Sequence, residues 1–579
     1  MHTRAQAASM LAGLALGAAV TSAAAQDVSV EFLGRFESGA FDEGAAEIAA
    51  FDADSGLVFV TNANANTVDA LDITDPSRPI LAFTIDLSSF GAGVNSVDVS
   101  GGRVAVAVEA DPPQDPGSVV FFGNDGSFES SVEVGALPDM LTYSPDGRWL
   151  LVANEGEPSD DYTVDPEGSV SVIRIRGDHP VRQRDVRTAG FGRLRAGDLD
   201  GGVRIFGPGA SIAQDLEPEF ITISEDSRFA YVVCQENNAI VEVFIPFAWV
   251  TDIFGLGTKD HAAPDNELDA SNRDDAINIR SWPVLGFYLP DSIASYAMGD
   301  STLIVTANEG DARDYDGFSE EARVGDVVLD PVAFPHAAAI QDDANLGRLK
   351  ITTTAGDPDG DGDFDQLFSY GGRSFSIFTT DGDLVFDSGS DFERITAGIL
   401  PDDFNSTNDE NGSFDDRSDD KGPEPEALTL GEIGSRTYAF IGAERVGGIF
   451  VYDITDPREP IFETYATSRD FGGDPAAGTA GDLAPEGLVF IPADDSPIGE
   501  PLLVAAHEVS GTTAIYRVIA DGGCTVFADL NGDCIVDVFD LLILLDALGP
   551  CRGCPEDLDG DGRVDLIDVL LLLRAALDG

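Results

Sequence analysis

A short motif that recurs along the chain constrains the fold more than any other feature of the sequence. Most copies begin with an acidic residue that follows a proline and opens a short apolar strand. The copies lie at residues 47–51, 96–99, 138–144, 218–223, 290–294, 425–428 and 485–490. A turn and a second apolar strand that ends in a polar cluster come next, as in residues 149–155 and 303–309. A third strand then follows, as in residues 168–173 and 448–453.

Repeated units of roughly four strands predict an all-β, seven-bladed β-propeller over residues 26–520. The seventh unit has only three clear strands, while residues 28–38 form an unassigned strand at the other end of the chain. We therefore expect this early strand to close the ring as the outer strand of the last blade. Long connections predict inserts near residues 154–168, 250–290 and 308–372. A run of tandem sandwiches is the alternative, but no linkers separate the units.

The end of the chain carries two copies of a calcium-loop pattern. Oxygen-bearing side chains occupy positions 1, 3, 5, 9 and 12 of each loop, and these residues are Asp529, Asn531, Asp533, Asp537 and Asp540, then Asp557, Asp559, Asp561, Asp565 and Asp568. Ca²⁺ binds six to eight oxygens, which such a run supplies from one tight turn. Each loop leads into a leucine-rich helical stretch, so residues 521–579 predict a small α-helical calcium-binding module. A solvated acidic tail is the alternative, but such tails lack paired leucine helices.

Four of the five cysteines lie in this terminal module: Cys524, Cys534, Cys551 and Cys554. In an oxidising compartment they predict two disulfides with three possible pairings. A zinc site at Cys551 and Cys554 is the alternative. Cys534 stands at position 6 of the first loop, where glycine normally makes the sharp turn, so this loop is expected to bind calcium more weakly or to be shaped by a disulfide.

The first residues and the overall charge indicate an exported protein. Arg4, a short apolar run and three alanines before Gln26 predict a signal peptide over residues 1–25. No stretch reaches the roughly 18 apolar residues that a membrane span needs. The formal charge of −71, from 104 acidic and 33 basic residues, excludes nucleic acid as a partner because the repulsion would be too strong. Salt adaptation and cation binding are the remaining interpretations.

The motif also predicts a ring of carboxylates at one end of the propeller channel, which we call the mouth. The first strands begin with Glu47, Asp139, Glu219, Asp291, Glu426 and Glu486, and the second strands end at Glu109, Glu155, Glu236, Glu309, Glu444 and Glu508. Converging carboxylates repel one another unless cations or protons lie among them. We therefore expect Ca²⁺ or another hard cation here, with Glu155, Asp160, Asp161, Glu309, Asp311 and Asp314 as the leading ligands. A solvated acidic rim is the alternative.

The third insert contains most of a further calcium loop. Its acidic residues are Asp357, Asp359, Asp361, Asp363 and Asp365, but Phe368 stands at position 12, where a closing carboxylate belongs. We expect a calcium site whose last oxygens come from a residue outside the loop. An ordinary Asp-Gly turn is the alternative.

Support for catalysis is thinner, since the sequence has no nucleophile elbow, zinc-protease helix or phosphate-binding loop. The candidate catalytic residues are Glu309, His507, Arg313 and Arg445, with Arg417 and Lys421 as further cations for a phosphate. A histidine in the position of His507 is more often structural.

Two resemblances extend this interpretation. The paired loop–helix units, with Asp at position 12, resemble a type I dockerin, and their cysteines resemble the Gly-Cys-type dockerins of exported proteins. Residues 269–274, 282–284, 307–315, 359–363 and 373–377 resemble the choice-of-anchor I domain family over nearly all of residues 28–520. The family resemblance implies a propeller on exported proteins whose C-terminal anchors vary.

The dockerin resemblance implies a cohesin-like or cell-envelope partner for residues 521–579. The combined prediction is an exported or cell-surface binding propeller with structural calcium and an unknown ligand. Because some members of the family are similar to alkaline-phosphatase or phytase-like proteins, the alternative is a secreted calcium-dependent phosphoesterase with its centre at the mouth.

Overall fold

In the computed structural model the chain divides into two compact units, residues 28–520 and residues 1–27 together with 521–579. The structure describes residues 28–177, 179–299, 301–520, 541, 543–545, 547–550, 558 and 563–578. The predicted signal peptide, the first terminal calcium loop and the four terminal cysteines lie outside the described residues. The unit of residues 28–520 carries the sites considered below.

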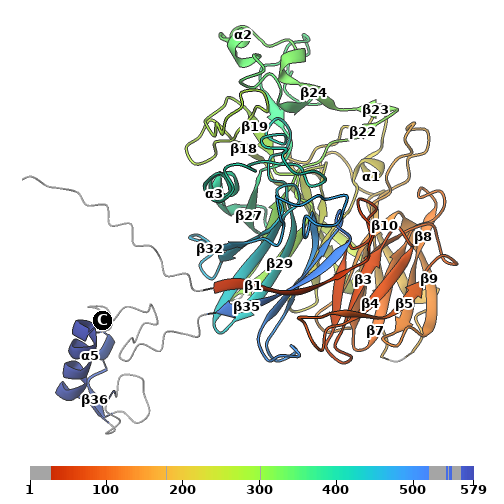
Figure 1. The fold of residues 1–579 in the computed structure, drawn as a ribbon. Coiled ribbons are helices and arrows are strands. Elements are labelled where there is room, and N and C mark those ends of the chain that lie inside the picture. The colour runs from red at the N-terminus through yellow and green to blue at the C-terminus, as the bar shows by residue number, and fades with distance from the viewer. Residues whose placement is uncertain are drawn as a thin grey trace, which may run out of the picture. The chain divides into compact units, whose positions relative to one another are not determined.

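This unit contains seven antiparallel four-stranded sheets among its described residues (Figure 1). The first sheet contains β2 (Ala49–Asp52), β3 (Leu57–Asn62), β4 (Thr67–Asp72) and β5 (Ile80–Asp86), and the second contains β6 (Val94–Ser100), β7 (Arg103–Val108), β8 (Pro116–Gly123) and β9 (Phe128–Ala136). The third sheet contains β10 (Pro138–Tyr143), β11 (Trp149–Asn154), β12 (Ser169–Arg174) and β13 (Val186–Gly190). The fourth contains β14 (Ile221–Ile223), β15 (Phe229–Cys234), β16 (Ala239–Phe244) and β17 (Trp249–Gly255). The fifth sheet contains β20 (Ile293–Met298), β21 (Ser301–Asn308), β27 (Ser374–Thr379) and β28 (Leu384–Asp387). The sixth contains β29 (Pro425–Ile433), β30 (Arg436–Ala443), β31 (Ile449–Asp453) and β32 (Ile461–Ala466). The seventh contains β33 (Pro485–Ile491), β34 (Leu502–His507), β35 (Thr512–Ala520) and β1 (Val28–Glu37).

The sheets form a closed ring through their first strands. Strand β2 contacts β6, and the contacts continue through β10, β14, β20, β29 and β33 back to β2. A ring of four-stranded antiparallel sheets around a common axis is a β-propeller. The predicted all-β propeller class is therefore confirmed, and the recurring motif marks the first strand of each sheet.

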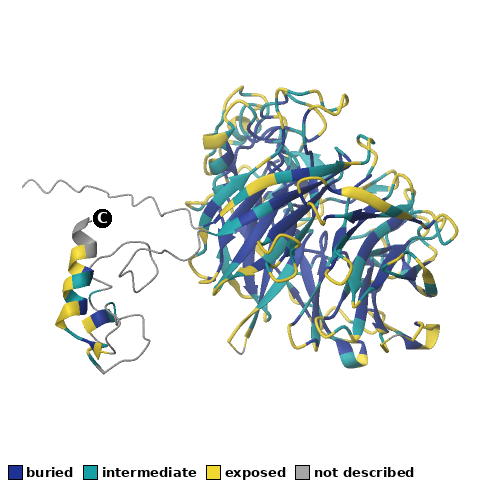
Figure 2. Cartoon of the chain, turned by 60° about the horizontal axis from the view of Figure 1, so that its bottom comes forward, coloured by how far each residue is buried: buried dark blue, intermediate teal, exposed yellow. Residues whose placement is uncertain are grey.

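Most of the hydrophobic core lies between neighbouring sheets. One cluster joins the first sheet to the second through Phe59, Val97 and Val106, and another joins the seventh to the first. The interior strands of this unit are largely buried (Figure 2). The middle strands are covered on both faces, so every residue of β7 is buried. For this reason the second strands are continuous apolar runs in the sequence instead of alternating ones.

Strand β1 closes the ring as the sequence predicts. It pairs antiparallel with β35, from Val28 opposite Ala520 to Glu37 opposite Thr512, with a bulge before Gly34. A Cβ atom on Gly34 would lie 2.4 Å from the Ser77 carbonyl oxygen, so only glycine permits this approach to the first sheet.

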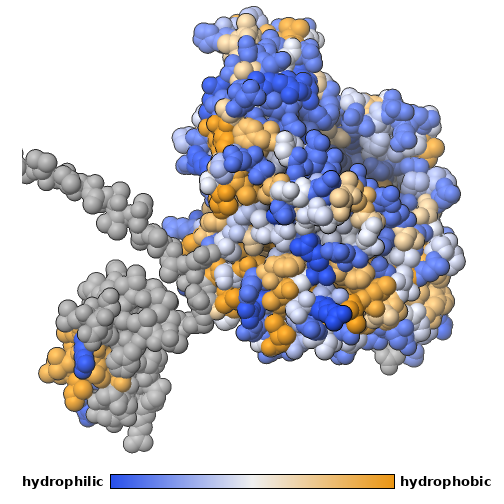
Figure 3. Space-filling view, viewed as in Figure 1, coloured by the Kyte–Doolittle hydropathy of each residue, from blue (hydrophilic) through white to orange (hydrophobic). Residues whose placement is uncertain are grey.

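Two of the predicted inserts pack together beside the fifth sheet. Their small sheets are β18 (Thr258–Asp260) with β19 (Leu285–Phe287) and β26 (Phe368–Ser369), β22 (Asp314–Tyr315) with β23 (Phe318–Ser319), and β24 (Glu321–Arg323) with β25 (Lys350–Thr352). Trp282 and Leu346 belong to the core that the two inserts share. Hydrophilic side chains cover much of this region in the view of Figure 3. A further long connection, residues 388–424, was not predicted.

Short helices complete the structure. They are η1 (Gln183–Asp185), α1 (Ile212–Asp215), η2 (Ile245–Phe247), η3 (Val324–Asp326), α2 (Ala337–Ile340) and α3 (Asp391–Ile399). The terminal unit contains β36 (Gly549–Pro550), β37 (Arg563–Val564) and α5 (Leu566–Asp578). Leu544, Val564 and Leu572 form its small core. No helix within the described ranges is long and apolar enough to cross a bilayer.

Candidate metal centre at the channel mouth

A repeated backbone geometry positions the mouth carboxylates. In four of the seven sheets the residue before the Pro-acid pair has a left-handed backbone, with φ of 44° at Leu137, 44° at Leu289, 51° at Glu424 and 60° at Ala484. The carbonyl of that residue accepts a hydrogen bond from a backbone N–H at the end of the second strand. In the four sheets the donors are, in order, Glu155, Gly310, Glu444 and Glu508, with N to O distances of 2.9, 2.9, 2.8 and 2.9 Å. Such a conformation is costly for a residue with a side chain. Its repetition holds the acid of the first strand beside the end of the second.

Most of the predicted carboxylates do converge. Burial raises the pKa of Glu47 to about 8, and repulsion from Glu508 and Asp139 adds to the effect. Burial and repulsion from other mouth carboxylates also hold the pKa values of six further groups well above their usual range: Glu155, Glu219, Asp291, Glu426, Glu444 and Glu486. Glu109 differs from this set. Burial and repulsion from Asp111 raise its pKa and a hydrogen bond from Asn95 lowers it, so the groups that act on it are not other carboxylates of the mouth.

Three mouth carboxylates form a group that could bind a cation. Oxygens of Glu47, Glu486 and Glu508 all lie within 4.8 Å of one another. The ion pairs among the described residues include none of the three. One buried oxygen of Glu486, Oε2, has no hydrogen-bond partner in the described part of the chain. We call this set the open triad.

A second group of three is already neutralised by cationic side chains. Glu309, Glu424 and Glu444 also have oxygens within 4.8 Å of one another. Lys421 Nζ lies 2.6 Å from Glu309 and 3.2 Å from Glu424, while Arg445 lies 2.9 Å from Glu424 and 3.0 Å from Glu444. We call this set the paired triad, because its charge is balanced within the protein.

Glu424 lies at the centre of the paired triad. Its carboxylate is fully buried, and Arg417 contacts it at 2.5 Å. Burial acts to raise the pKa of Glu424, but Lys421, Arg417 and Arg445 outweigh burial and hold it far below the usual range. Three of the four cations that the sequence suggested for a phosphate therefore contact a carboxylate that sequence reasoning missed.

The structure does not bring the leading predicted ligands into the open triad. Asp160 and Asp161 are exposed in a loop, and Asp314 is exposed in strand β22. The carboxylate of Asp161 accepts hydrogen bonds from neighbouring hydroxyls, 2.9 Å from Ser159 and 2.7 Å from Thr163. Glu309 belongs to the paired triad. Asp311 is half-exposed, 3.9 Å from Lys421.

Two of the candidate catalytic residues are buried inside the protein. His507 is 2% exposed, and its Nδ1 lies 3.1 Å from the Ala505 carbonyl oxygen. Burial lowers the pKa of His507, which keeps the ring neutral. Arg313 is 1% exposed and forms ion pairs with Asp215 at 2.9 Å and Glu217 at 2.8 Å. Neither side chain is free to reach a substrate.

A polar pocket lies next to the open triad. Its volume is about 330 Å³, and Glu508 of the open triad and Glu444 of the paired triad both line it. Asp42, Asp409 and Arg445 complete its charged wall. The pocket could admit a small polar ligand beside a cation held by the open triad.

The insert loop brings three of its five aspartates together. Oxygens of Asp357, Asp359 and Asp361 lie within 4.8 Å of one another. Phe368, at the position of the closing carboxylate, instead stacks on Phe287 with ring centroids 4.9 Å apart. The Asp330 N–H donates to the Phe364 carbonyl at 3.0 Å, so Asp330 approaches the loop from outside it.

The described residues include the end of the second terminal loop. Asp568 is buried and accepts N–H bonds from Leu558 at 2.8 Å and Asp565 at 2.7 Å. The other predicted ligands of the two terminal loops lie outside the described residues: Asp529, Asn531, Asp533, Asp537, Asp540, Asp557, Asp559 and Asp561.

Comparisons with known proteins agree with the motifs of the sequence. The model of the choice-of-anchor I domain matches residues 47–457, well over half of the chain. Gigasin-3a of Magallana gigas is 35% identical over 191 residues, which are 31% of this chain and 67% of that protein. The mesenchyme-specific cell surface glycoprotein of Strongylocentrotus purpuratus is 29% identical over 296 residues, 44% of this chain and 37% of that protein.

Two solved structures show distant similarity. Kuenenia stuttgartiensis hydrazine synthase matches with a TM-score of 0.43 and 12% identity, over 84% of this chain and all of the matched chain. The Cps50 (Swd1) β-propeller domain of Myceliophteria thermophila matches with a TM-score of 0.40 and 8% identity, over 85% and 100%.

Proposed function

The chain belongs to the choice-of-anchor I domain family, and from this premise we propose that it is an exported, surface-associated binding module. In this proposal each of the seven sheets is one blade of a seven-bladed propeller. The signal-like residues 1–25 direct export, and the propeller presents its mouth to a ligand. The cell-surface description of one relative supports a surface location.

The mouth would hold a structural calcium ion at the open triad. The observation that carries this proposal is the approach of Glu47, Glu486 and Glu508 to within 4.8 Å without an ion-pair partner among the described residues. Three carboxylates this close cannot all be ionised at neutral pH unless a cation lies between them. An all-oxygen set suits a hard cation, and Ca²⁺ accepts both monodentate and bidentate carboxylates. The ion would then form the floor of the neighbouring polar pocket.

Two further calcium sites belong to the proposal. The insert loop of Asp357, Asp359, Asp361, Asp363 and Asp365 would bind one ion, with Asp330 as the residue from outside the loop. The terminal module would bind calcium through its two dockerin-like loops and attach the propeller to a cohesin-like or cell-envelope partner. The spacing of the loop aspartates supports this attachment.

We do not propose the phosphoesterase alternative as a second function. Arg445, Arg417 and Lys421 each contact a carboxylate of the paired triad, so they are poorly placed to neutralise a phosphate. Catalysis by this chain stays a prediction without a supporting observation.

Calorimetric titration of the full chain with Ca²⁺ tests the mouth site. Glu486→Gln removes one charge of the open triad, so we expect one class of calcium sites to disappear while the others remain. The matched control is Glu432→Gln, an exposed glutamate near the other end of a first strand, β29, which should leave the titration unchanged. An identical isotherm for Glu486→Gln and the unaltered protein would contradict the mouth site.

A further inference from the structure

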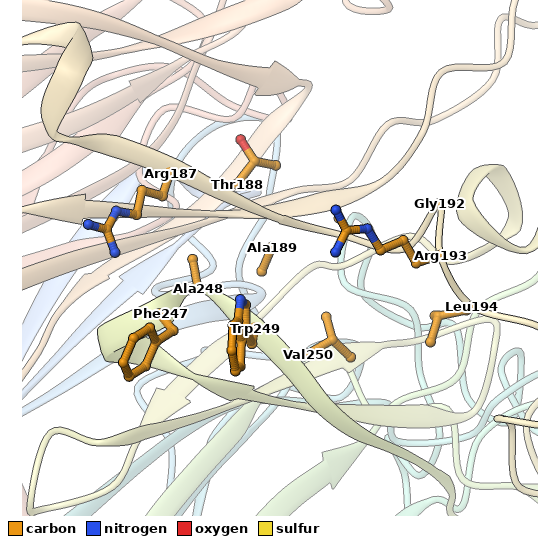
Figure 4. Close-up of a pocket in the computed structure, with 11 residues that line it drawn as sticks. Arg187, Thr188, Ala189, Gly192, Arg193, Leu194, Phe247, Ala248, Trp249 and Val250 are labelled. Atoms are coloured by element: carbon orange, nitrogen blue, oxygen red, sulfur yellow. The ribbon is translucent and has the colours of Figure 1, made fainter.

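A groove of about 770 Å³ lies between the outer strands of the third and fourth sheets, β13 and β17, and its lining residues include no carboxylate of the mouth. Arg187 and Arg193 line one side of it, and Phe247 and Trp249 line the other (Figure 4). Its volume falls in the range of ligand sites, which is roughly 300–1,000 Å³.

The arginine side of the groove contrasts with the rest of this acidic chain. Residues 174–195 contain seven arginines and only two aspartates, whereas the whole chain has 104 acidic and 33 basic residues. All seven arginines are exposed: Arg174, Arg176, Arg182, Arg184, Arg187, Arg193 and Arg195. This stretch is therefore a local positive patch on a strongly negative protein.

The two arginines of the groove are not neutralised by the protein. Asp185 pairs with Arg176 at 3.0 Å, but no ion pair among the described residues involves Arg187 or Arg193. Arg187 donates one hydrogen bond to the Pro246 carbonyl at 3.2 Å, which leaves most of its donors free. At the mouth, by contrast, the cations contact carboxylates.

The aromatic side of the groove is held open to solvent by a short turn. Phe247 is 55% exposed and Trp249 is 61% exposed. Phe247 stacks on Phe244 at 5.6 Å and contacts Trp249 at 5.2 Å. Pro246 and the left-handed Ala248, with φ of 52°, fix the turn that presents both rings. An exposed apolar surface that is held in place by a strained backbone conformation is typical of an interaction site.

We propose that this groove binds an acidic oligosaccharide, a sugar chain that carries carboxylate or sulfate groups. The guanidinium groups of Arg187 and Arg193 offer paired donors that match the oxygens of such anions. The apolar faces of sugar rings pack on flat aromatic side chains, which Phe247 and Trp249 supply. A chain of net charge −71 repels densely charged polymers, so a sparsely charged, ring-containing anion suits this groove better than nucleic acid. The inference goes beyond the proposed function and does not depend on calcium.

Binding of hyaluronan oligosaccharides, which carry one carboxylate for every two sugar rings, to the full chain, measured by calorimetry in 150 mM NaCl, tests the proposal. Arg187→Gln with Arg193→Gln should weaken binding at least about tenfold, since each loses a charge-assisted hydrogen bond. Trp249→Ala should weaken it several-fold. Matched controls elsewhere on the surface are Arg78→Gln and Phe128→Ala, a 56% exposed aromatic residue, and both should bind normally.

Other probes separate this idea from its rivals. Uncharged dextran should not bind, and chelator or Glu486→Gln should leave oligosaccharide binding intact even if the mouth site fails. Binding that is insensitive to the arginine and tryptophan substitutions would overturn the proposal. Polyphosphate or a single-stranded oligonucleotide that bound equally well through the same arginines would also overturn it, because the groove would then recognise negative charge and not sugar rings.

Discussion

At the level of single residues, the neighbours of each buried carboxylate determine whether it is paired with a cation of the protein or is left to bind a proton or a metal ion. Glu424 and Glu486 both lie at Pro-acid motifs, but Glu424 precedes its proline and Glu486 follows it. Glu424 meets three cations, whereas Glu486 meets Glu47 and Glu508. Acids on the two sides of the motif's proline therefore belong to different clusters, one balanced by cations and one that needs a proton or a metal ion.

The open triad predicts an unusual pH dependence when calcium is absent. The carboxyl of Glu47 titrates near 4.5 when unfolded and at about 8 when folded. Between these pH values the folded state holds more protons, so the free energy of unfolding must fall as pH rises. In chelator, the melting temperature should decline from pH 5 to pH 8, and Glu47→Gln should flatten the decline.

The matched control is Asp86→Asn, at an exposed carboxylate. Hydrogen bonds from Ser88 hold the pKa of Asp86 below its usual value, so its effect on stability is confined to more acidic solution. Calcium should abolish the decline in the unaltered protein. A melting temperature in chelator that rises from pH 5 to pH 8 would show that the triad is not protonated in the folded state.

Arg313 should be essential for stability and not for chemistry. Its removal in Arg313→Met leaves Asp215 and Glu217 buried without their cation, a change that typically costs about 3–5 kcal/mol. Arg394→Gln breaks an exposed pair with Glu267 and should cost at most about 1 kcal/mol. Urea unfolding measures both, and equal small effects would refute the structural role of Arg313.

The sequence indicated which residues reach the mouth but not which of them form groups. The recurring motif identified Glu47 and Glu486 at the starts of first strands and Glu508 at the end of a second strand, because the ends of strands are set by local sequence. The structure places Glu309 and Asp311 beside Lys421, a cation whose position at the mouth the sequence did not predict. Lys421 reaches Glu309 from residues 388–424, a connection without a repeating pattern.

At the level of elements, the ring depends on a strand from the start of the chain. Strand β1 contributes Val28 to a core with Tyr438 and Val518, and it supplies the fourth strand of the last sheet. A variant that lacks residues 28–37 leaves the outer edge of β35 unpaired. Its melting temperature should fall by more than about 10 °C, consistent with a loss of several kcal/mol.

The control for this truncation is a variant that begins at residue 28, which keeps β1 complete. Adding a synthetic peptide of residues 28–37 should restore part of the lost stability of the truncated protein. Unfolding of the truncated variant at the temperature of the full chain would contradict the closure of the ring by β1.

Strand positions were more predictable than the inserts. The first and second strands stand out because both faces of each sheet are covered, which requires long apolar runs such as β7 and β34. The inserts between β17 and β20 and between β21 and β27 share a core around Trp282. That association joins residues far apart in the chain, and no local pattern reports it.

At the level of the whole molecule, calcium would couple the mouth to global stability. An ion that binds only the folded state stabilises it by about 2.7 kcal/mol at a concentration of one hundred times Kd. Saturating Ca²⁺ should therefore raise the melting temperature of the propeller, and Glu508→Gln should remove much of that gain. Asp359→Asn, in the insert loop, should remove a different and independent part.

The most direct test of the mouth site is anomalous diffraction from crystals of the protein grown in calcium. The proposal predicts an anomalous peak about 2.3–2.6 Å from carboxylate oxygens of Glu47, Glu486 and Glu508. The proposal would be contradicted if the three side chains were resolved without an anomalous peak between them and were joined to one another by hydrogen bonds through shared protons.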